Sequence, residues 1–190
     1  AVVHQLVPLY GPKTTVITMQ NGIPFWYFHK HGGALEGTRV NAVDPGGVCM
    51  DGIPAERIIG CVVYPAAELV APGVIKVIEG NRFTLGELDG AKTPRLELLA
   101  QTLIRVGFKT PISTDIRSEI WLKLWGNLSF NPISALTHAT LVDICQFAET
   151  RALAATMMKE AQDIAQKLGV TFRVSIDKRI AGAEAVGAHK

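Results

Sequence analysis

Three polar side chains recur at intervals of four residues in the second half of this sequence: Lys123, Asn127 and Asn131. On a helix over residues 115–131, with about 100° per residue, they lie within about 80° of one another and span about 12 Å. The same sector carries the apolar stripe Ile116, Ile120, Leu124 and Leu128. Burying an ammonium and two amides is costly unless polar partners satisfy them. This row of three residues, the polar ladder, therefore predicts a binding site for a polar ligand.

The chemistry of the polar ladder suggests proton transfer as well as binding. Burial lowers the pKa of an ammonium group, which suits Lys123 to donate a proton near neutrality. Simpler explanations stay open for each residue alone: Lys123 could snorkel, and Asn127 could cap a neighbouring helix. Asn131 precedes Pro132 and could be the N-cap of a following helix. The alignment of all three favours the ligand site.

Asn21 is a second candidate site residue. It follows a β-branched run at residues 14–19, which is typical of a buried strand. Ligands of open α/β sheets bind at the carboxyl ends of such strands. Asn-Gly is also a common turn, and the local sequence alone favours that simpler explanation.

Other kinds of chemistry find no support in the sequence. The three cysteines have no CxxC spacing, the five histidines have no metal-ligand spacing, and no nucleophile elbow is present. We therefore expect no metal site and no acyl transfer. Trp121 and Trp125, four residues apart, are expected to lie in the core. A net charge of +2, with scattered basic residues, argues against nucleic acid. No apolar run approaches the length of a membrane span, and the cysteine usage favours the cytoplasm.

The first part of the chain has the pattern of a mixed α/β domain. A hydrophobic content of 48% in 190 residues is enough to bury a core. We expect the end of a helix at residues 2–9, buried strands at 14–19 and 57–64, and an amphipathic helix at 94–106. An extended piece should follow at 108–113. Turn residues predict hairpins over residues 39–48 and 74–85.

From residue 114 onward the pattern becomes helical. Helices are expected at 115–130, 132–145, 147–168 and 177–188, with Gly169 as a stop, and only residues 170–174 have a strand pattern. The predicted fold class is thus α/β followed by all-α, with domains at residues 1–113 and 114–190. The absence of an initiator methionine suggests that the chain is a fragment.

These features together resemble the ketopantoate reductase family, also called 2-dehydropantoate 2-reductases. The resemblance rests on the signature E-x-W-x-K-x-x-x-N-x-x-x-N-P at residues 119–132 and on Gln20-Asn21-Gly22 after a strand. Segments Gly80-Asn-Arg82 and Leu85-Gly-Glu87 also fit. The resemblance implies the end of a Rossmann-type NADP-binding domain, followed by a helical domain of the 6-phosphogluconate dehydrogenase type.

The resemblance also implies roles for individual residues. Lys123 matches the family's proton donor, and Asn127 and Asn131 match its substrate-binding asparagines. Asn21 would lie by nicotinamide and substrate, and Ala66 would touch the cofactor, NADP(H). The implied reaction is the NADPH-dependent reduction of 2-dehydropantoate to pantoate, a step of pantothenate and coenzyme A biosynthesis.

Some features of the sequence depart from the family pattern. The G-x-G-x-x-G phosphate loop is absent, and Leu141 stands where some members have a further substrate-binding asparagine. Two alternatives stay open: a related β-hydroxyacid or 2-oxo-acid dehydrogenase with another substrate, and a non-catalytic helical dimerisation or ligand-binding module. The long C-terminal helices could also form a homodimer surface.

Overall fold

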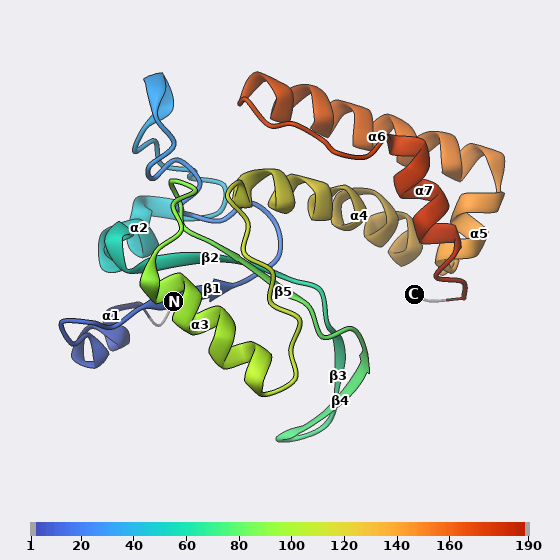
Figure 1. Ribbon diagram of the computed structural model, residues 1–190. Coiled ribbons are helices and arrows are strands. Elements are labelled where there is room, and N and C mark those ends of the chain that lie inside the picture. Colours follow the sequence, from blue (N-terminus) through green and yellow to red (C-terminus); the bar gives the residue numbers. More distant parts are fainter. Residues whose placement is uncertain (1–2, 189–190) are drawn as a thin grey trace. The chain divides into compact units, whose positions relative to one another are not determined.

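The computed structural model describes residues 3–188. They divide into two compact units, of which the first ends at Glu119 and the second begins at Ile120 (Figure 1). The first contains the strands and the second is helical. The boundary expected at residues 113 and 114 stays a prediction about the domains of the protein. Within the described residues, no helix is long and apolar enough to cross a membrane.

Three strands form the sheet at the centre of the first unit. β1 (Val16–Met19) runs parallel to β2 (Ile58–Val63), and β5 (Phe83–Gly86) pairs antiparallel with β2 on its other side. Both expected strands are therefore present. β2 is buried as expected, whereas β1 is only half-buried and ends at the exposed Met19. The expected helix end is also present, as α1 (Val3–Leu6) and η1 (Val7–Leu9), while Val2 lies outside the described residues.

Helix α3 (Pro94–Arg105) covers one face of this sheet, as its apolar spacing predicts. Thr93 caps the helix, because its side chain accepts a hydrogen bond from the Leu96 amide, and Pro94 occupies the first turn. The buried cluster beneath the helix consists of Ile59, Cys61, Leu85, Leu96 and Ala100. The extended piece after α3 is confirmed by two parallel β-bridges. Lys109 pairs with Arg82, the residue before β5, and Ile112 pairs with Leu85 of β5.

Two paired glycines allow close packing on the opposite face of the sheet. Gly60 lies opposite Gly86 in the β2–β5 register. A Cβ atom on Gly60 would come within 2.9 Å of the Trp26 ring, and one on Gly86 within 2.9 Å of the Ile116 side chain. The first turn of helix α4 (Ile116–Thr137) therefore lies directly against the strands.

The hairpin predicted over residues 39–48 is wrong. These residues form turns that lead through η3 (Pro45–Gly47) into α2 (Val48–Gly52). The buried Asp44 carboxylate accepts hydrogen bonds of 2.9 Å from the amides of Cys49 and Met50, so it satisfies the open amides of a helix rather than a strand turn. Short helices η2 (Gly33–Leu35) and η4 (Ala55–Arg57) complete this region.

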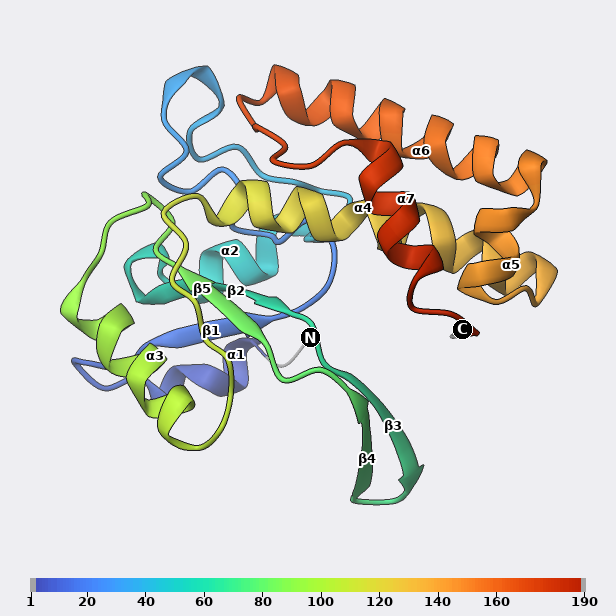
Figure 2. The same ribbon diagram turned by 45° about the vertical axis from the view of Figure 1, so that its right-hand side comes forward.

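The second predicted hairpin, over residues 74–85, is also wrong in its pairing. β4 (Val74–Glu79) pairs with β3 (Ala66–Ala71), whereas β5 pairs with β2. The turn of the true hairpin contains Gly73, whose φ of 75° suits glycine, and Gly80-Asn81 instead connects the β3–β4 hairpin to the sheet. The hairpin projects from the sheet in both ribbon views, and nearly all its residues are exposed (Figures 1 and 2).

The second unit contains most of α4, followed by α5 (Leu141–Gln146), α6 (Ala148–Lys167) and α7 (Ile176–Glu184). The last three pack against one another (Figure 2). The stop at Gly169, with φ of 83°, is confirmed, and residues 170–174 form no strand. A capping box of Thr140 and Asp143 begins α5.

The helix break expected at Pro132 is wrong, because α4 continues through this residue to Thr137. Proline inside a helix removes one amide donor and usually costs about 3 kcal/mol. Phe130 and Ile133, on either side of Pro132, are buried, so packing holds the helix intact across it. Asn131 is therefore not a helix cap.

Glu87 forms a buried ion pair that we expect to stabilise the first unit. Its carboxylate accepts hydrogen bonds from Arg95 Nε (2.7 Å), Arg95 Nη2 (2.5 Å) and Thr93 Oγ1 (2.5 Å). Burial alone would raise the pKa of Glu87, but the hydrogen bonds and charge of these partners hold it below its ordinary value. Glu87→Gln should lower the free energy of unfolding by about 1–2 kcal/mol at neutral pH.

The sign of the Glu87 pKa shift sets the pH dependence of this difference. Because the folded state lowers the pKa, the stabilisation is present above the unfolded pKa of about 4.3 and is lost as the pH falls through the folded pKa. Urea unfolding of wild type and variant should therefore converge in acid. Glu97→Gln, at an exposed position of α3, is the control and should change little. A difference that persisted down to about pH 2 would contradict this role of Glu87.

Candidate active site

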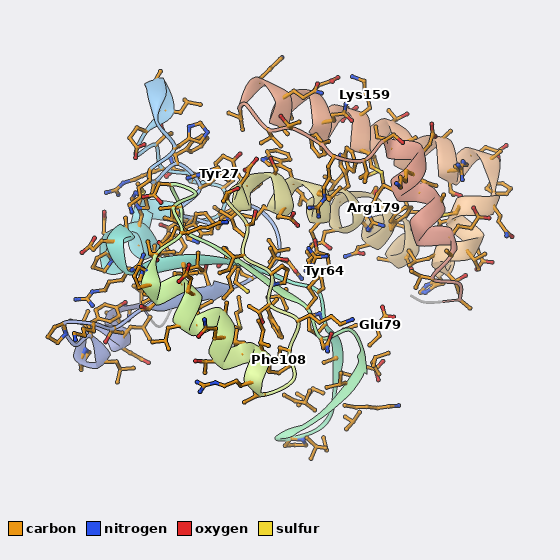
Figure 3. The ribbon with its side chains drawn as sticks, viewed as in Figure 1. Tyr27, Tyr64, Glu79, Phe108, Lys159 and Arg179 are labelled. Atoms are coloured by element: carbon orange, nitrogen blue, oxygen red, sulfur yellow. The ribbon has the colours of Figure 1, made fainter. Side chains whose placement is uncertain are left out.

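The carboxyl ends of β1 and β2 bring two of the predicted site residues to one edge of the sheet. The strands are parallel, and Met19 is in register with Cys61. Asn21 follows β1 and is exposed. Ala66 begins β3, with two residues between it and the end of β2, and is half-buried. Tyr64, labelled in Figure 3, lies at the same end of β2. This is the edge at which open α/β sheets bind ligands, so both residues lie where a ligand could contact them.

Arg117 anchors the first turn of α4 to the loops around the sheet. Its guanidinium donates hydrogen bonds to three backbone carbonyls, those of Tyr27 (2.8 Å), His29 (2.6 Å) and Leu88 (2.5 Å). It also lies 5.6 Å from the centre of the Tyr27 ring, and burial lowers its pKa. These contacts tie the first turn of α4 to loops within the first unit.

The sequence interpretation missed Arg117. Its signal is an arginine directly after Ile116, the first residue of the apolar stripe, where a charged side chain needs partners. Those partners are carbonyl groups of loops distant in the sequence, which no local pattern reveals.

In the second unit, α4 buries the face centred on Trp125. The Trp125 indole donates a 3.0 Å hydrogen bond to the Met158 carbonyl of α6 and stacks on Phe172, with ring centres 4.3 Å apart. Arg179 of α7, labelled in Figure 3, lies 5.7 Å from the centre of the Phe130 ring. Trp121 and Trp125 are both buried, which confirms that they belong to the core.

The polar ladder is less buried than its spacing suggested. Lys123 and Asn127 are half-buried, and Asn131 is exposed. Ile116 and Ile120 are buried as expected, but further along α4 the buried face moves to Trp125 and the residues one and two turns beyond it. Each ladder residue is two positions along the chain from a residue of this buried face. Two positions correspond to a rotation of about 200° around the helix axis, so the ladder lies on nearly the opposite side of α4. The placement in a fully buried sector was therefore wrong, and the ladder remains accessible to a ligand.

The polar ladder by itself offers one cation and two amides to a polar molecule. Lys123 can donate a proton or stabilise a developing oxyanion, and amides bind oxygen atoms in either hydrogen-bonding role. Among the residues that the structure describes, no group of three or more His, Cys, Asp or Glu side chains could hold a metal ion.

Sequence comparison relates this chain to known reductases. Residues 115–190 match the family described as "Ketopantoate reductase PanE/ApbA C terminal". A curated protein of Mesorhizobium japonicum named 2-dehydropantoate 2-reductase is 58% identical over 186 residues, which cover 98% of this chain and 57% of that protein. The chain thus spans somewhat more than half the length of this relative.

Solved structures share the fold. One from Ralstonia solanacearum MolK2, assigned to the ketopantoate reductases, is 38% identical, with a TM-score of 0.95 over all of this chain and 59% of that one. A D-mandelate dehydrogenase in complex with NADH, at 18% identity, matches 96% of this chain and 54% of its own with a TM-score of 0.76, a likeness of fold alone. The fold class is confirmed: the end of a Rossmann-type domain, followed by a helical domain. On this sequence and structural evidence, the chain belongs to the ketopantoate reductase family.

Proposed function

We propose that the full-length protein reduces 2-dehydropantoate to pantoate with NADPH, in the route to pantothenate and coenzyme A. The observation that carries the proposal is the 58% identity to a 2-dehydropantoate 2-reductase over nearly the whole chain. The signature at residues 119–132 supports it, because its lysine and both asparagines stand on one uninterrupted helix.

Lys123 would act as the proton donor of this reaction. Reduction of a ketone places negative charge on the C2 oxygen, and an ammonium group stabilises that charge and then neutralises it. Lys123 is half-buried, which restricts its hydration without removing it from a ligand. Asn127 and Asn131 would orient the substrate through its hydroxyl or carboxylate oxygens.

Asn21 and Ala66 would hold the nicotinamide end of the cofactor at the carboxyl edge of β1 and β2. When bound, the reduced nicotinamide supplies the hydride. NADPH rather than NADH is part of the proposal. Purified full-length protein, supplied in turn with each reduced cofactor, should oxidise NADPH faster.

A substrate panel tests the reaction itself. Full-length protein and NADPH should give the highest kcat/KM with 2-dehydropantoate among small 2-oxo acids that include pyruvate and phenylglyoxylate. Higher efficiency on another acid would assign the enzyme to a different substrate, and no turnover of any of them would overturn the proposal.

Asn21→Ala should raise KM for both NADPH and 2-dehydropantoate, because Asn21 would lie where the two meet. The exposed position of Asn21 predicts little change in thermal stability. Steady-state kinetics in both substrates, together with a melting curve, checks this. A lower melting temperature with unchanged kinetics would mean that Asn21 serves only to form a turn.

A further inference from the structure

Arg82 lies at the same edge of the sheet as Asn21. Arg82 directly precedes β5, whose first residue, Phe83, pairs with Val63 at the carboxyl end of β2. That end adjoins the carboxyl end of β1, after which Asn21 follows. The backbone of Tyr64 donates a 3.0 Å hydrogen bond to the Arg82 carbonyl, which ties the two residues together at this edge.

Three neighbours hold the Arg82 guanidinium in place. Its Nε donates a 3.1 Å hydrogen bond to Thr84 Oγ1. Its central carbon lies 5.1 Å from the centre of the Tyr64 ring, within the range of a cation–π contact. Its Nη2 is 3.8 Å from a carboxylate oxygen of Glu119, whose side chain is only 9% exposed. The guanidinium is therefore oriented by a hydroxyl, an aromatic face and a buried carboxylate.

These contacts leave the terminal nitrogens of Arg82 available. In the part of the chain that the structure describes, neither one donates a hydrogen bond to another residue, since the Glu119 oxygen is beyond hydrogen-bonding distance. The side chain is 40% exposed. A guanidinium remains charged at all accessible pH values and offers up to four donors on its terminal nitrogens. Such a group, held at the edge where open α/β sheets bind ligands, is suited to recognise an anion.

We propose that Arg82 binds the carboxylate of the 2-oxo acid substrate and so determines the preference for acids; this inference rests on the proposed reductase function. A 2-oxo acid carries its carboxylate next to the carbonyl that is reduced. The residues proposed to bind substrate are neutral apart from Lys123, which serves the C2 oxygen. A carboxylate taken from water needs a charged or multiple hydrogen-bond donor, and a guanidinium matches its two oxygens with two parallel N–H groups.

The test compares an acid with its uncharged analogue in the full-length enzyme. The substrates are 2-dehydropantoate and the corresponding 2-oxo amide, which keeps the reacting ketone and loses the carboxylate charge. Arg82→Met should lower kcat/KM for the acid by about tenfold or more, the scale of a lost hydrogen bond to a charged group. The kcat/KM for the amide should change little. The acid-to-amide ratio, which is kcat/KM for the acid divided by kcat/KM for the amide, therefore falls. Arg82→Lys, which keeps the charge but not the paired donors, should recover part of the ratio.

Arg105→Met is the matched control, because it removes one positive charge from an exposed arginine at the end of α3. Its acid-to-amide ratio should equal that of wild type. If Arg82 had a purely structural role, Arg82→Met would lower kcat/KM equally for both substrates or would shift only the melting temperature. Either result would overturn the proposal. If Arg82→Met does not fold, an unchanged ratio in Arg82→Lys would also overturn it. Failure of wild type to reduce any 2-oxo acid would instead overturn the proposed function.

Discussion

Lys123→Met should lower kcat of the full-length enzyme by about 10²-fold or more, the usual scale for the loss of a general acid. Methionine keeps an unbranched apolar stem and removes only the ammonium, so the variant tests charge rather than packing. Since Lys123 is half-buried, the stem can keep its contacts and the melting temperature should change little. Steady-state kinetics with NADPH and 2-dehydropantoate measures the effect.

The Lys123 result can be separated from a general disturbance of α4. Lys123→Ala should show at least the same loss in kcat, while KM for NADPH should stay near the wild-type value in both variants. Near-normal kcat in Lys123→Met would exclude Lys123 as the proton donor.

The second large effect is expected at Asn127. Asn127→Ala should cost about 1.5–3 kcal/mol in kcat/KM, the scale of a hydrogen bond to a charged or developing-charge group. Stability should hardly change, because Asn127 lies away from the buried Trp125 face and alanine has the higher helix propensity. Steady-state kinetics gives the change in kcat/KM, and urea unfolding of the same preparation gives the change in the free energy of unfolding.

Gln101→Ala, at an exposed position of α3, serves as the control for an amide truncated on a helix. It should leave both kcat/KM and the unfolding midpoint unchanged. Asn131→Ala should resemble Asn127→Ala in its kinetics and should not reduce stability, because Asn131 is inside α4 and caps no helix. Stability losses with intact kcat/KM in both asparagine variants would mean that these amides serve packing alone.

The sequence predicted the elements whose signals are local. The strands at residues 14–19 and 57–64 are rich in β-branched residues, and α3 has an amphipathic period with a cap at Thr93. The two hairpins failed because strand pairing depends on distant segments. Residues 74–79 pair with β3 rather than with β5. The turn-rich sequence after Asp44 leads into a helix, and the Asp44 carboxylate accepts hydrogen bonds from the first amides of that helix.

The candidate site was only partly predictable for a related reason. The spacing of Lys123, Asn127 and Asn131 identified a shared helix face, but not how much of it is buried. That depends on α6 and α7, which cover the Trp125 side. The sequence placed Arg82 only in a segment that fits the family and gave no role to Arg82 or Arg117, because their partners are Tyr64, Glu119 and backbone carbonyls far away in the chain.

The exposed β3–β4 hairpin has a consequence for how this chain behaves in concentrated solution. Two strands alone are rarely stable in water, and Leu69, Ile75 and Val77 are each more than 60% exposed. Such β-prone segments promote intermolecular pairing and aggregation. Lys76, which lies opposite Glu68, and Glu79 at the end of β4 interrupt the apolar run with charges that act as gatekeepers. We therefore expect these charged residues to oppose aggregation of the chain.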